Sequence, residues 1–154
     1  MENSSHLDRF VDSTLDLMPR MLRGFMREER NLLSRGVISL PQFWMLQIIR
    51  ESSRCLMNDL ARALSIPPST LTSMADRLVE LKLILRHTDP EDRRAVRLTL
   101  TPEGEQTLHD ILEQKRDMAL RIFAKVSEED RAAYLRVIEQ VVRQLNQSHP
   151  EVKP

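Results

Sequence analysis

The sequence predicts a mainly α-helical winged helix-turn-helix protein, with a two-stranded β wing and a helical dimerisation bundle made by the N- and C-terminal helices. With 154 residues, 41% of them hydrophobic, and only three glycines, the chain can bury one core that is mostly helical. Two short helical patterns are followed by a charged hairpin, and long amphipathic patterns lie at both ends. We therefore expect one domain over residues 1–154, with dimerisation helices at about 1–35 and 102–147 around a winged-helix lobe at about 40–101.

Two helices are predicted in the first third of the chain. Apolar side chains recur at helical spacing over residues 5–33, which indicates a long first helix. Pro19 lies inside this pattern, and since a proline removes one backbone hydrogen bond and clashes with the preceding turn, we expect a kink or two abutting helices there. Ser39 and Gln42 have the spacing of a capping box, which predicts a second helix of about 11 residues.

The helix-turn-helix pattern follows. Leu56, Leu60 and Leu64 predict its first helix. Pro67 and Pro68 end that helix, because a proline disfavours helical geometry in the residue before it. A second helix begins within these prolines and Ser69, and its inward side chains are Leu71, Met74, Ala75, Leu78, Val79 and Leu81.

The outward side chains of this second helix are mostly short hydroxyls. Hydroxyls of this kind can bond base edges or phosphate in a DNA major groove, and Arg77 can bond guanine through two parallel donors. An ordinary solvated face would carry the same residue types, so that alternative stays open. The outward set is Ser69, Thr70, Thr72, Ser73, Asp76 and Arg77.

A charged hairpin comes next, with strands predicted at residues 83–87 and 95–101. Asp89 precedes a proline and is a turn signal, and Asp92 lies near enough along the chain to pair with the guanidinium of Arg94. An arginine held in one direction at a projecting tip suits a narrow A·T minor groove, where negative potential is concentrated. Taken alone, such a pair is more often a surface ion pair that contributes little to stability.

Two further helices are predicted after the hairpin. Thr101 and Pro102 begin a helix that runs to about Lys125, and Ser127 begins a last helix with acidic residues in its first turn. Both carry apolar stripes that a small lobe cannot cover. Together with the first helix, they predict a bundle shared between two copies of the chain.

Five short groups of residues succeed one another through the helix-turn-helix and hairpin: Asp59-Leu60-Ala61, Arg77-Leu78, Leu83-Ile84 with Arg86, Asp92-Arg93-Arg94, and Leu98-Thr99 with Gly104. In this order they resemble the MarR family of bacterial transcriptional regulators. The similarity covers about residues 10–147, with the motifs confined to 56–104. Lys82 stands where the family usually has glycine, so a left-handed residue there would cost about 1 kcal/mol.

The resemblance implies a homodimer that binds a pseudo-palindromic double-stranded DNA operator, with one recognition helix per half-site, and represses a promoter in response to a ligand. The net charge of the chain is zero, so phosphate contacts would depend on a few placed arginines: Arg54, Arg62, Arg77, Arg86, Arg93, Arg94 and Arg97. The residues predicted to form the DNA-binding site are Ser69, Thr70, Thr72, Ser73, Arg77, Arg86, Asp92, Arg93 and Arg94.

The resemblance also implies a small-molecule pocket between the bundle and the lobe. Methionines adapt to irregular shapes and an indole offers a flat wall, which favours an aromatic or amphipathic effector. The same side chains would serve equally as core. The candidates are Met18, Met21, Leu22, Phe25, Trp44 and Met45.

Two alternative functions stay open. Zero net charge and Lys82 fit a dimeric winged helix that binds proteins instead of DNA. Cys55 fits a redox-responsive regulator if the neighbouring Arg54 lowers its pKa, although a partly buried cysteine in a helix connection explains it as well.

Several classes of protein are not expected. Scattered histidines and the lack of a glycine-rich phosphate loop predict no enzyme, no metal site and no cofactor. No apolar run reaches the roughly 18 residues of a membrane span, and the polar start has no signal-peptide pattern. We therefore expect a cytoplasmic protein without a membrane partner.

Overall fold

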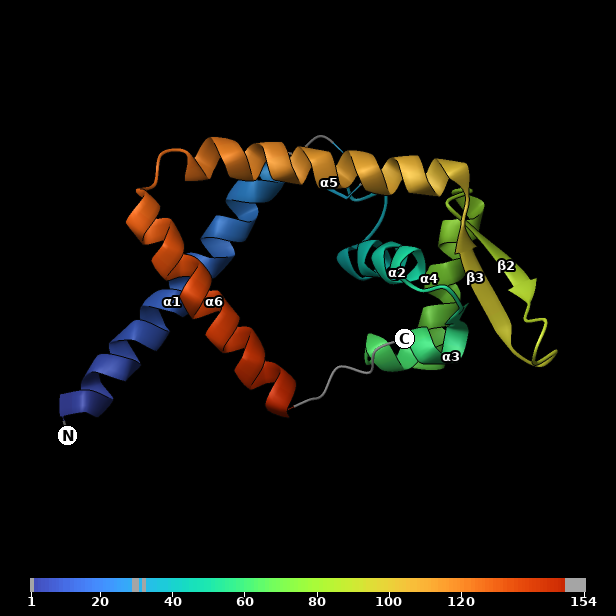
Figure 1. Ribbon diagram of the computed structural model, residues 1–154, viewed down its shortest axis with the longest axis horizontal. Coiled ribbons are helices and arrows are strands. Elements are labelled where there is room, and N and C mark those ends of the chain that lie inside the picture. Colours follow the sequence, from blue (N-terminus) through green and yellow to red (C-terminus); the bar gives the residue numbers. More distant parts are fainter. Residues whose placement is uncertain (1, 29–30, 32, 149–154) are drawn as a thin grey trace.

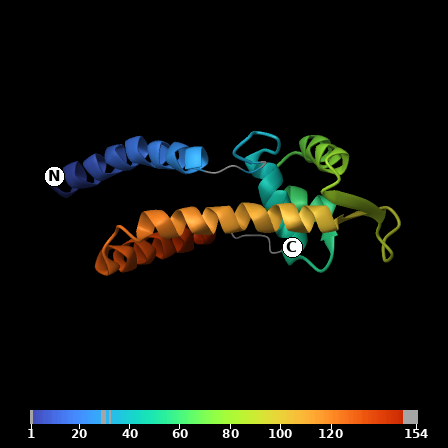
Figure 2. The ribbon, with the colours of Figure 1, turned by 90° about the horizontal axis from the view of Figure 1, so that it is seen from above.

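A compact lobe at one end of a long helix, α5, and two helices at its other end make an elongated molecule (Figure 1). The computed structural model describes residues 2–28, 31 and 33–148. Figure 2 shows α1 as a layer of its own beside α5 and α6. The described elements are α1 (Glu2–Glu28), α2 (Leu40–Glu51), β1 (Cys55–Leu56), α3 (Met57–Ala63), α4 (Pro68–Glu80), β2 (Ile84–Thr88), β3 (Val96–Leu100), α5 (Pro102–Phe123) and α6 (Glu128–Ser148).

The first two helices of the chain agree with the predictions in part. Helix α1 continues through Pro19, so the predicted alternative of two abutting helices is wrong. Residues 29, 30 and 32, which the predicted first helix included, lie outside the described residues. At the start of α2 the capping box is confirmed, because the Gln42 amide donates to Ser39 Oγ and the Ser39 amide donates to Gln42 Oε1.

The turn between α3 and α4 depends on one residue in the left-handed region. Ser65 has a φ of 52°, and its amide donates to the Arg62 carbonyl, while the Ile66 amide donates to the Ala61 carbonyl. This pair of bonds ends α3, and Pro68 then begins α4. Helix α4 buries Leu71, Ala75 and Leu78. Val79 was predicted to face inward, but it is exposed because it lies one residue, about 100° of helix rotation, beyond that stripe.

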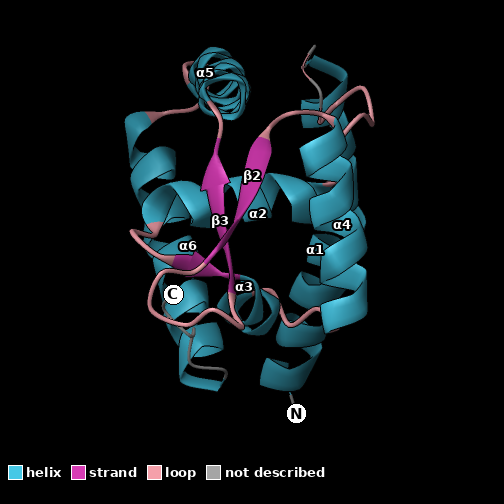
Figure 3. Ribbon diagram, turned by 90° about the vertical axis from the view of Figure 1, so that its right-hand side faces the viewer, coloured by secondary structure: helices cyan, strands magenta, loops and turns pink. Residues whose placement is uncertain are grey.

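The predicted hairpin of two strands is confirmed, and it forms a sheet with a third strand that was not predicted. The antiparallel sheet has the order β1-β3-β2, so β3 lies in the middle and β2 forms the outer strand of the wing (Figure 3). Cys55 pairs with Leu98, which places β1 at the foot of the wing. Strand β1 was not predicted, because a strand of two residues has no hydrophobic period.

The core belongs to the lobe and to the first half of α5. Its largest fully buried apolar side chains come from α2, α3, α4, the sheet, α5 and the turns next to α2 and β2, so the wing and the recognition helix share one support. They are Ile38, Met45, Leu46, Leu60, Leu71, Leu78, Leu83, Ile84, Leu98, Leu108 and Ile111.

Helices α1 and α6 have a different character. Of the 23 large apolar side chains that are exposed in the described part of the chain, 16 lie on these two helices, and neither contributes a buried apolar residue to the lobe. None of the described helices is both long enough and apolar enough to cross a membrane. Both helices thus carry apolar faces that the described part of this chain does not cover.

Helix α5 begins very close to the strand that leads into the wing. The Gly104 amide donates to Thr101 Oγ1, and the Thr101 amide donates to the Leu83 carbonyl. A Cβ atom on Gly104 would lie 2.0 Å from the Leu83 carbonyl oxygen. The glycine therefore permits a backbone approach that no other residue allows.

The junction between α4 and the wing contains the second left-handed residue. Lys82 has a φ of 58°, its amide donates to the Val79 carbonyl, and the Leu83 amide donates to the Leu78 carbonyl. The hydroxyl of Thr101 also donates to the Lys82 carbonyl, at 2.6 Å. The left-handed cap considered from the sequence is therefore present, with a lysine in place of glycine.

Replacing Lys82 by glycine is expected to raise the free energy of unfolding by about 0.5–1 kcal/mol, because glycine adopts this conformation without a steric penalty. Urea denaturation measures the change. Glu80→Gly is the control, since that residue lies in the helix and its change should cost about 1 kcal/mol. Equal destabilisation by both variants would contradict the account of the cap.

Candidate DNA-binding surface

The exposed face of α4 carries short hydroxyls and one arginine. Thr72 Oγ1 donates to the Pro68 carbonyl at 2.9 Å, and Ser73 Oγ donates to the Ser69 carbonyl at 3.3 Å. Both hydroxyl oxygens keep lone pairs that can accept hydrogen bonds from outside the helix. Five residues of the predicted site are exposed on this helix: Ser69, Thr70, Thr72, Ser73 and Arg77.

Arg86 joins the wing to α4. Its Nη1 lies 2.5 Å from Asp76 Oδ1, and its Nη2 donates to the Thr72 carbonyl at 3.0 Å. The Arg86 side chain is 31% exposed, so it retains some solvent contact. Arg86, which the sequence predicted as a DNA contact, therefore also holds strand β2 against α4.

The wing tip presents the predicted aspartate and arginines. Asp92 Oδ1 accepts the Arg94 amide at 3.0 Å and lies 3.6 Å from Arg94 Nε. The Arg94 side chain is 94% exposed, and Arg93 is exposed beside it. The pairing expected from the sequence is present, with the guanidinium free to reach outward.

A buried carboxylate lies at the base of this tip. The side chain of Asp89 is 0% exposed, and its Oδ2 accepts Arg54 Nε at 3.0 Å while its Oδ1 accepts Arg54 Nη2 at 2.6 Å. Oδ1 also accepts the amides of Glu91 and Asp92. From the sequence, Asp89 was predicted as a turn signal, and Arg54 as a phosphate contact or as a neighbour that lowers the pKa of Cys55. This ion pair, whose partners lie 35 residues apart, was not predicted.

Both groups of this pair stay charged over the neutral range. The hydrogen bond from Arg54 lowers the pKa of Asp89, against the opposing effect of burial, and the same bond raises the pKa of Arg54. A carboxyl whose pKa is lower in the folded chain adds stability above its unfolded pKa and loses it as the pH falls through the folded value. The pair is therefore intact wherever the pH lies well above the ordinary pKa of an aspartate.

Cys55 lies in strand β1 and is buried. Burial raises the pKa of its thiol to about 11, and the Asp59 carboxylate adds to the rise. The expectation that Arg54 lowers this pKa is wrong, because the Arg54 guanidinium is bound to Asp89. A buried neutral thiol does not favour a redox-responsive site.

Cys55 is expected to react with iodoacetamide at pH 8 about 100-fold more slowly in the folded protein than in the same protein unfolded in urea, because the raised pKa removes thiolate. Mass spectrometry of timed samples measures the two rates. Rapid modification of the folded protein would restore the redox-responsive alternative.

The predicted pocket residues do not gather at one place. Met21 and Phe25 line a groove between α1 and α5, whose volume is about 610 Å³ and whose wall includes Met118. Met18 and Met21 line another groove on α1. Met45 is buried in the lobe core instead, while Leu22 and Trp44 are about half exposed.

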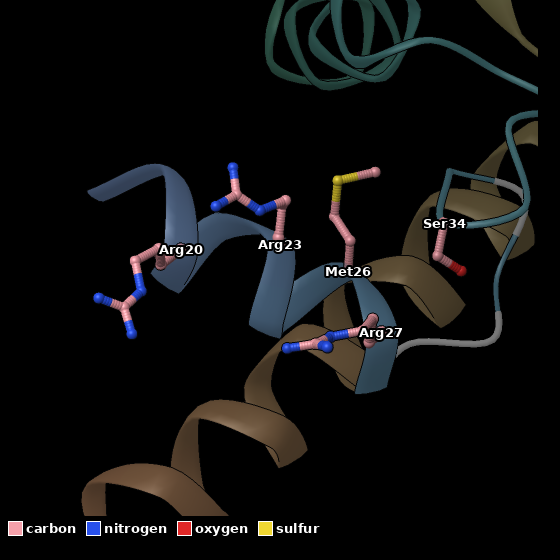
Figure 4. A pocket seen from close by; sticks show the side chains of 5 residues that line it. All are labelled: Arg20, Arg23, Met26, Arg27 and Ser34. Carbon is pink, nitrogen blue, oxygen red and sulfur yellow. The ribbon is translucent and has the colours of Figure 1, made fainter. Parts of the chain in front are cut away.

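A separate pocket beside α1 is lined mainly by arginines (Figure 4). Its volume is about 490 Å³, and in the close-up Arg23 and Met26 point to the same side of α1. None of the predicted pocket residues lines it. The lining residues are Arg20, Arg23, Met26, Arg27 and Ser34.

The chain is similar to known proteins in sequence and in fold. The MarR family model matches residues 38–96. The chain is 30% identical over 105 residues to YsmB of Bacillus subtilis, an HTH-type transcriptional regulator, covering 68% of this chain and 72% of YsmB. It is 29% identical over 93 residues to the Bacillus subtilis transcriptional repressor MdtR, covering 60% of each. The structure of RV1404 from Mycobacterium tuberculosis is 26% identical, superposes with a TM-score of 0.74, and covers 90% of this chain and 92% of RV1404.

Proposed function

The chain belongs to the MarR family of DNA-binding transcriptional regulators, which are not enzymes, and we propose that it is a ligand-responsive repressor that binds a pseudo-palindromic operator as a homodimer. The observation that carries the proposal is the shared support of α4 and the wing. One core holds both elements, and Arg86 links them through Asp76. A recognition helix in the major groove and an arginine in the adjacent minor groove would thus approach DNA as one rigid unit.

The contacts divide into two kinds. The hydroxyls of α4 and Arg77 would read base edges, whereas Arg93 and Arg94 at the wing tip would add affinity through the minor groove and phosphates. Asp92 would orient Arg94, since it accepts the backbone amide of that residue and lies beside its guanidinium. Arg86 would contribute mainly by holding the two elements together.

A second copy of the chain is the proposed cover for the exposed apolar faces of α1 and α6. Those faces hold most of the exposed large apolar side chains, and a closed two-fold dimer would bury them against identical faces. In this arrangement about residues 1–35 and 102–147 form the bundle, and the lobe at about 40–101 is carried on each side. Two lobes related by the two-fold axis match an operator with two half-sites.

An aromatic or amphipathic small molecule is the proposed effector. The groove between α1 and α5 has an apolar wall that includes Met21, Phe25 and Met118, and its charged lining residues are Glu28, Arg121 and Lys125. Both walls of this groove belong to the proposed bundle, and α5 continues from the groove to the lobe (Figure 1), so a ligand here would act on the lobe through α5. That position suits a molecule that changes the separation of the two lobes.

Operator binding is tested by fluorescence anisotropy with DNA that flanks the protein's own coding region, titrated in salt, and with shuffled DNA of equal length as the control. We expect tighter binding to the flanking DNA and an affinity that falls with rising salt, because phosphate contacts release counterions. If neither DNA binds at low salt, the protein-interaction alternative takes the place of the proposal.

Arg94→Ala is expected to weaken operator binding by about 5- to 100-fold with folding unchanged, because an exposed guanidinium at the tip contacts DNA and packs against little else. Asp92→Ala should also weaken binding, although it removes a negative charge, because Arg94 loses its orienting partner. Anisotropy titrations measure both, with Arg136→Ala on exposed α6 as control. Tighter binding by Asp92→Ala would show that the aspartate is only a solvated charge.

A further inference from the structure

Two arginines tie the wing to the segment just before β1. Arg54, which lies in that segment, binds both carboxylate oxygens of Asp89. Arg97 of β3 donates from Nη2 to the Ser53 carbonyl at 2.7 Å. The wing is therefore fixed at its base on the side opposite to the contact that Arg86 makes with α4. Of these contacts, only the one through Asp89 continues to the tip.

The continuation is a series of short hydrogen bonds. Asp89 Oδ1 accepts the Asp92 amide at 2.9 Å, and Asp92 Oδ1 accepts the Arg94 amide at 3.0 Å. The backbone closes the same loop, since the Asp89 amide donates to the Ala95 carbonyl and the Ala95 amide donates to the Asp92 carbonyl. The conformation that presents Arg94 is thus built directly on the carboxylate of Asp89.

Arg54 is the side chain that holds this carboxylate in place. Its Nη1 also lies 2.8 Å from Glu91 Oε2, so one guanidinium contacts two of the three acidic side chains of the loop. Asp89 is fully buried, whereas Glu91 is 71% exposed. A planar guanidinium can bond both oxygens of a carboxylate and a third acceptor at once, and a lysine ammonium cannot reproduce that geometry.

We propose that Arg54 is a positioning residue for DNA binding, which acts through Asp89 to fix the direction in which the wing tip presents Arg94. The inference rests on the proposed contact between Arg94 and the operator. It predicts that the shape of the guanidinium, and not only its charge, determines affinity. It also predicts that the effect of Arg54 passes through Arg94 and not through the recognition helix.

The test is a pair of double-mutant cycles on the full-length protein. Arg54→Lys keeps the charge and is expected to weaken operator binding about tenfold, because the fork onto Asp89 is lost. In the Arg94→Ala background the same change should weaken binding less than about twofold, whereas in the Arg77→Ala background it should retain its full effect. Circular dichroism and urea denaturation of each variant establish that the variants fold.

A hydroxyl-radical footprint supplies a readout that a general loss of stability would not give. Arg54→Lys should lose protection in the minor groove that flanks each half-site and keep the protection made by α4. Additive effects in the Arg94 cycle, or full affinity in Arg54→Lys, would overturn the role of Arg54. Failure of the unaltered protein to bind its operator would instead overturn the proposed function, so the two failures are distinguishable.

Discussion

Gly104→Ala is expected to lower the free energy of unfolding by more than about 3 kcal/mol, because the new methyl group would meet backbone and not a flexible side chain. The Cβ atom would lie 2.0 Å from the Leu83 carbonyl oxygen and 2.9 Å from its carbonyl carbon. To relieve the overlap, α5 must move away from the wing strand, which breaks the bond from the Thr101 amide to the Leu83 carbonyl. A loss of this size is a large part of the stability of most domains.

Urea denaturation and thermal unfolding measure the effect of this change. Glu105→Ala is the matched control, since Glu105 is exposed in the same helical turn and its side chain meets no comparable obstacle. Operator binding should fall together with stability, because the displaced strand carries the wing. A Gly104→Ala protein as stable as the control would show that α5 can move away from Leu83 without a loss of stability.

The second large effect is expected at the proposed dimer interface. Placing glutamates at Ile138 and Val141 should raise the dissociation constant of the dimer by at least about 1000-fold, because each desolvated carboxylate costs several kcal/mol in an apolar interface. Both side chains belong to the exposed apolar face of α6, at helical positions i and i+3. The variant should sediment as a monomer and bind operator weakly, since one lobe engages only one half-site.

Sedimentation velocity over a range of protein concentrations measures the dissociation. The control places glutamates at Arg136 and Gln140, on the opposite face of the same helix, where water remains the neighbour. That variant should stay dimeric. A dimer that survives the substitutions at Ile138 and Val141 would exclude α6 from the interface.

Local chemistry made much of the lobe predictable. The capping box of Ser39 and Gln42, the prolines before α4 and the alternating strand around Leu98 each act within a few residues. Such signals can be read from the sequence because the interacting groups are close along the chain. The family resemblance extended this to the order of the elements and to Gly104.

What could not be predicted depends on residues distant in the sequence. The ion pair of Arg54 and Asp89 joins residues 35 positions apart, and β1 exists only because Cys55 meets Leu98 of β3. The positions of the pocket candidates likewise depend on tertiary packing that the sequence pattern does not show. Met45 was assigned to a ligand site because methionines suit one, but α2 turns this side chain fully into the core, where methionines serve equally well.

Helix α5 joins the lobe to the groove beside α1, and its residue count sets the distance between them. Its first half is anchored in the lobe core by Leu108 and Ile111, and its second half carries Met118 at the groove beside α1. At 1.5 Å per residue, its 22 residues span about 33 Å, close to one helical turn of B-DNA. Adding a single residue to the middle of α5 would turn the lobe by about 100° relative to the groove beside α1, whereas adding about seven residues, close to two turns, would nearly restore its orientation. The number of residues in α5 therefore sets the orientation of the lobe.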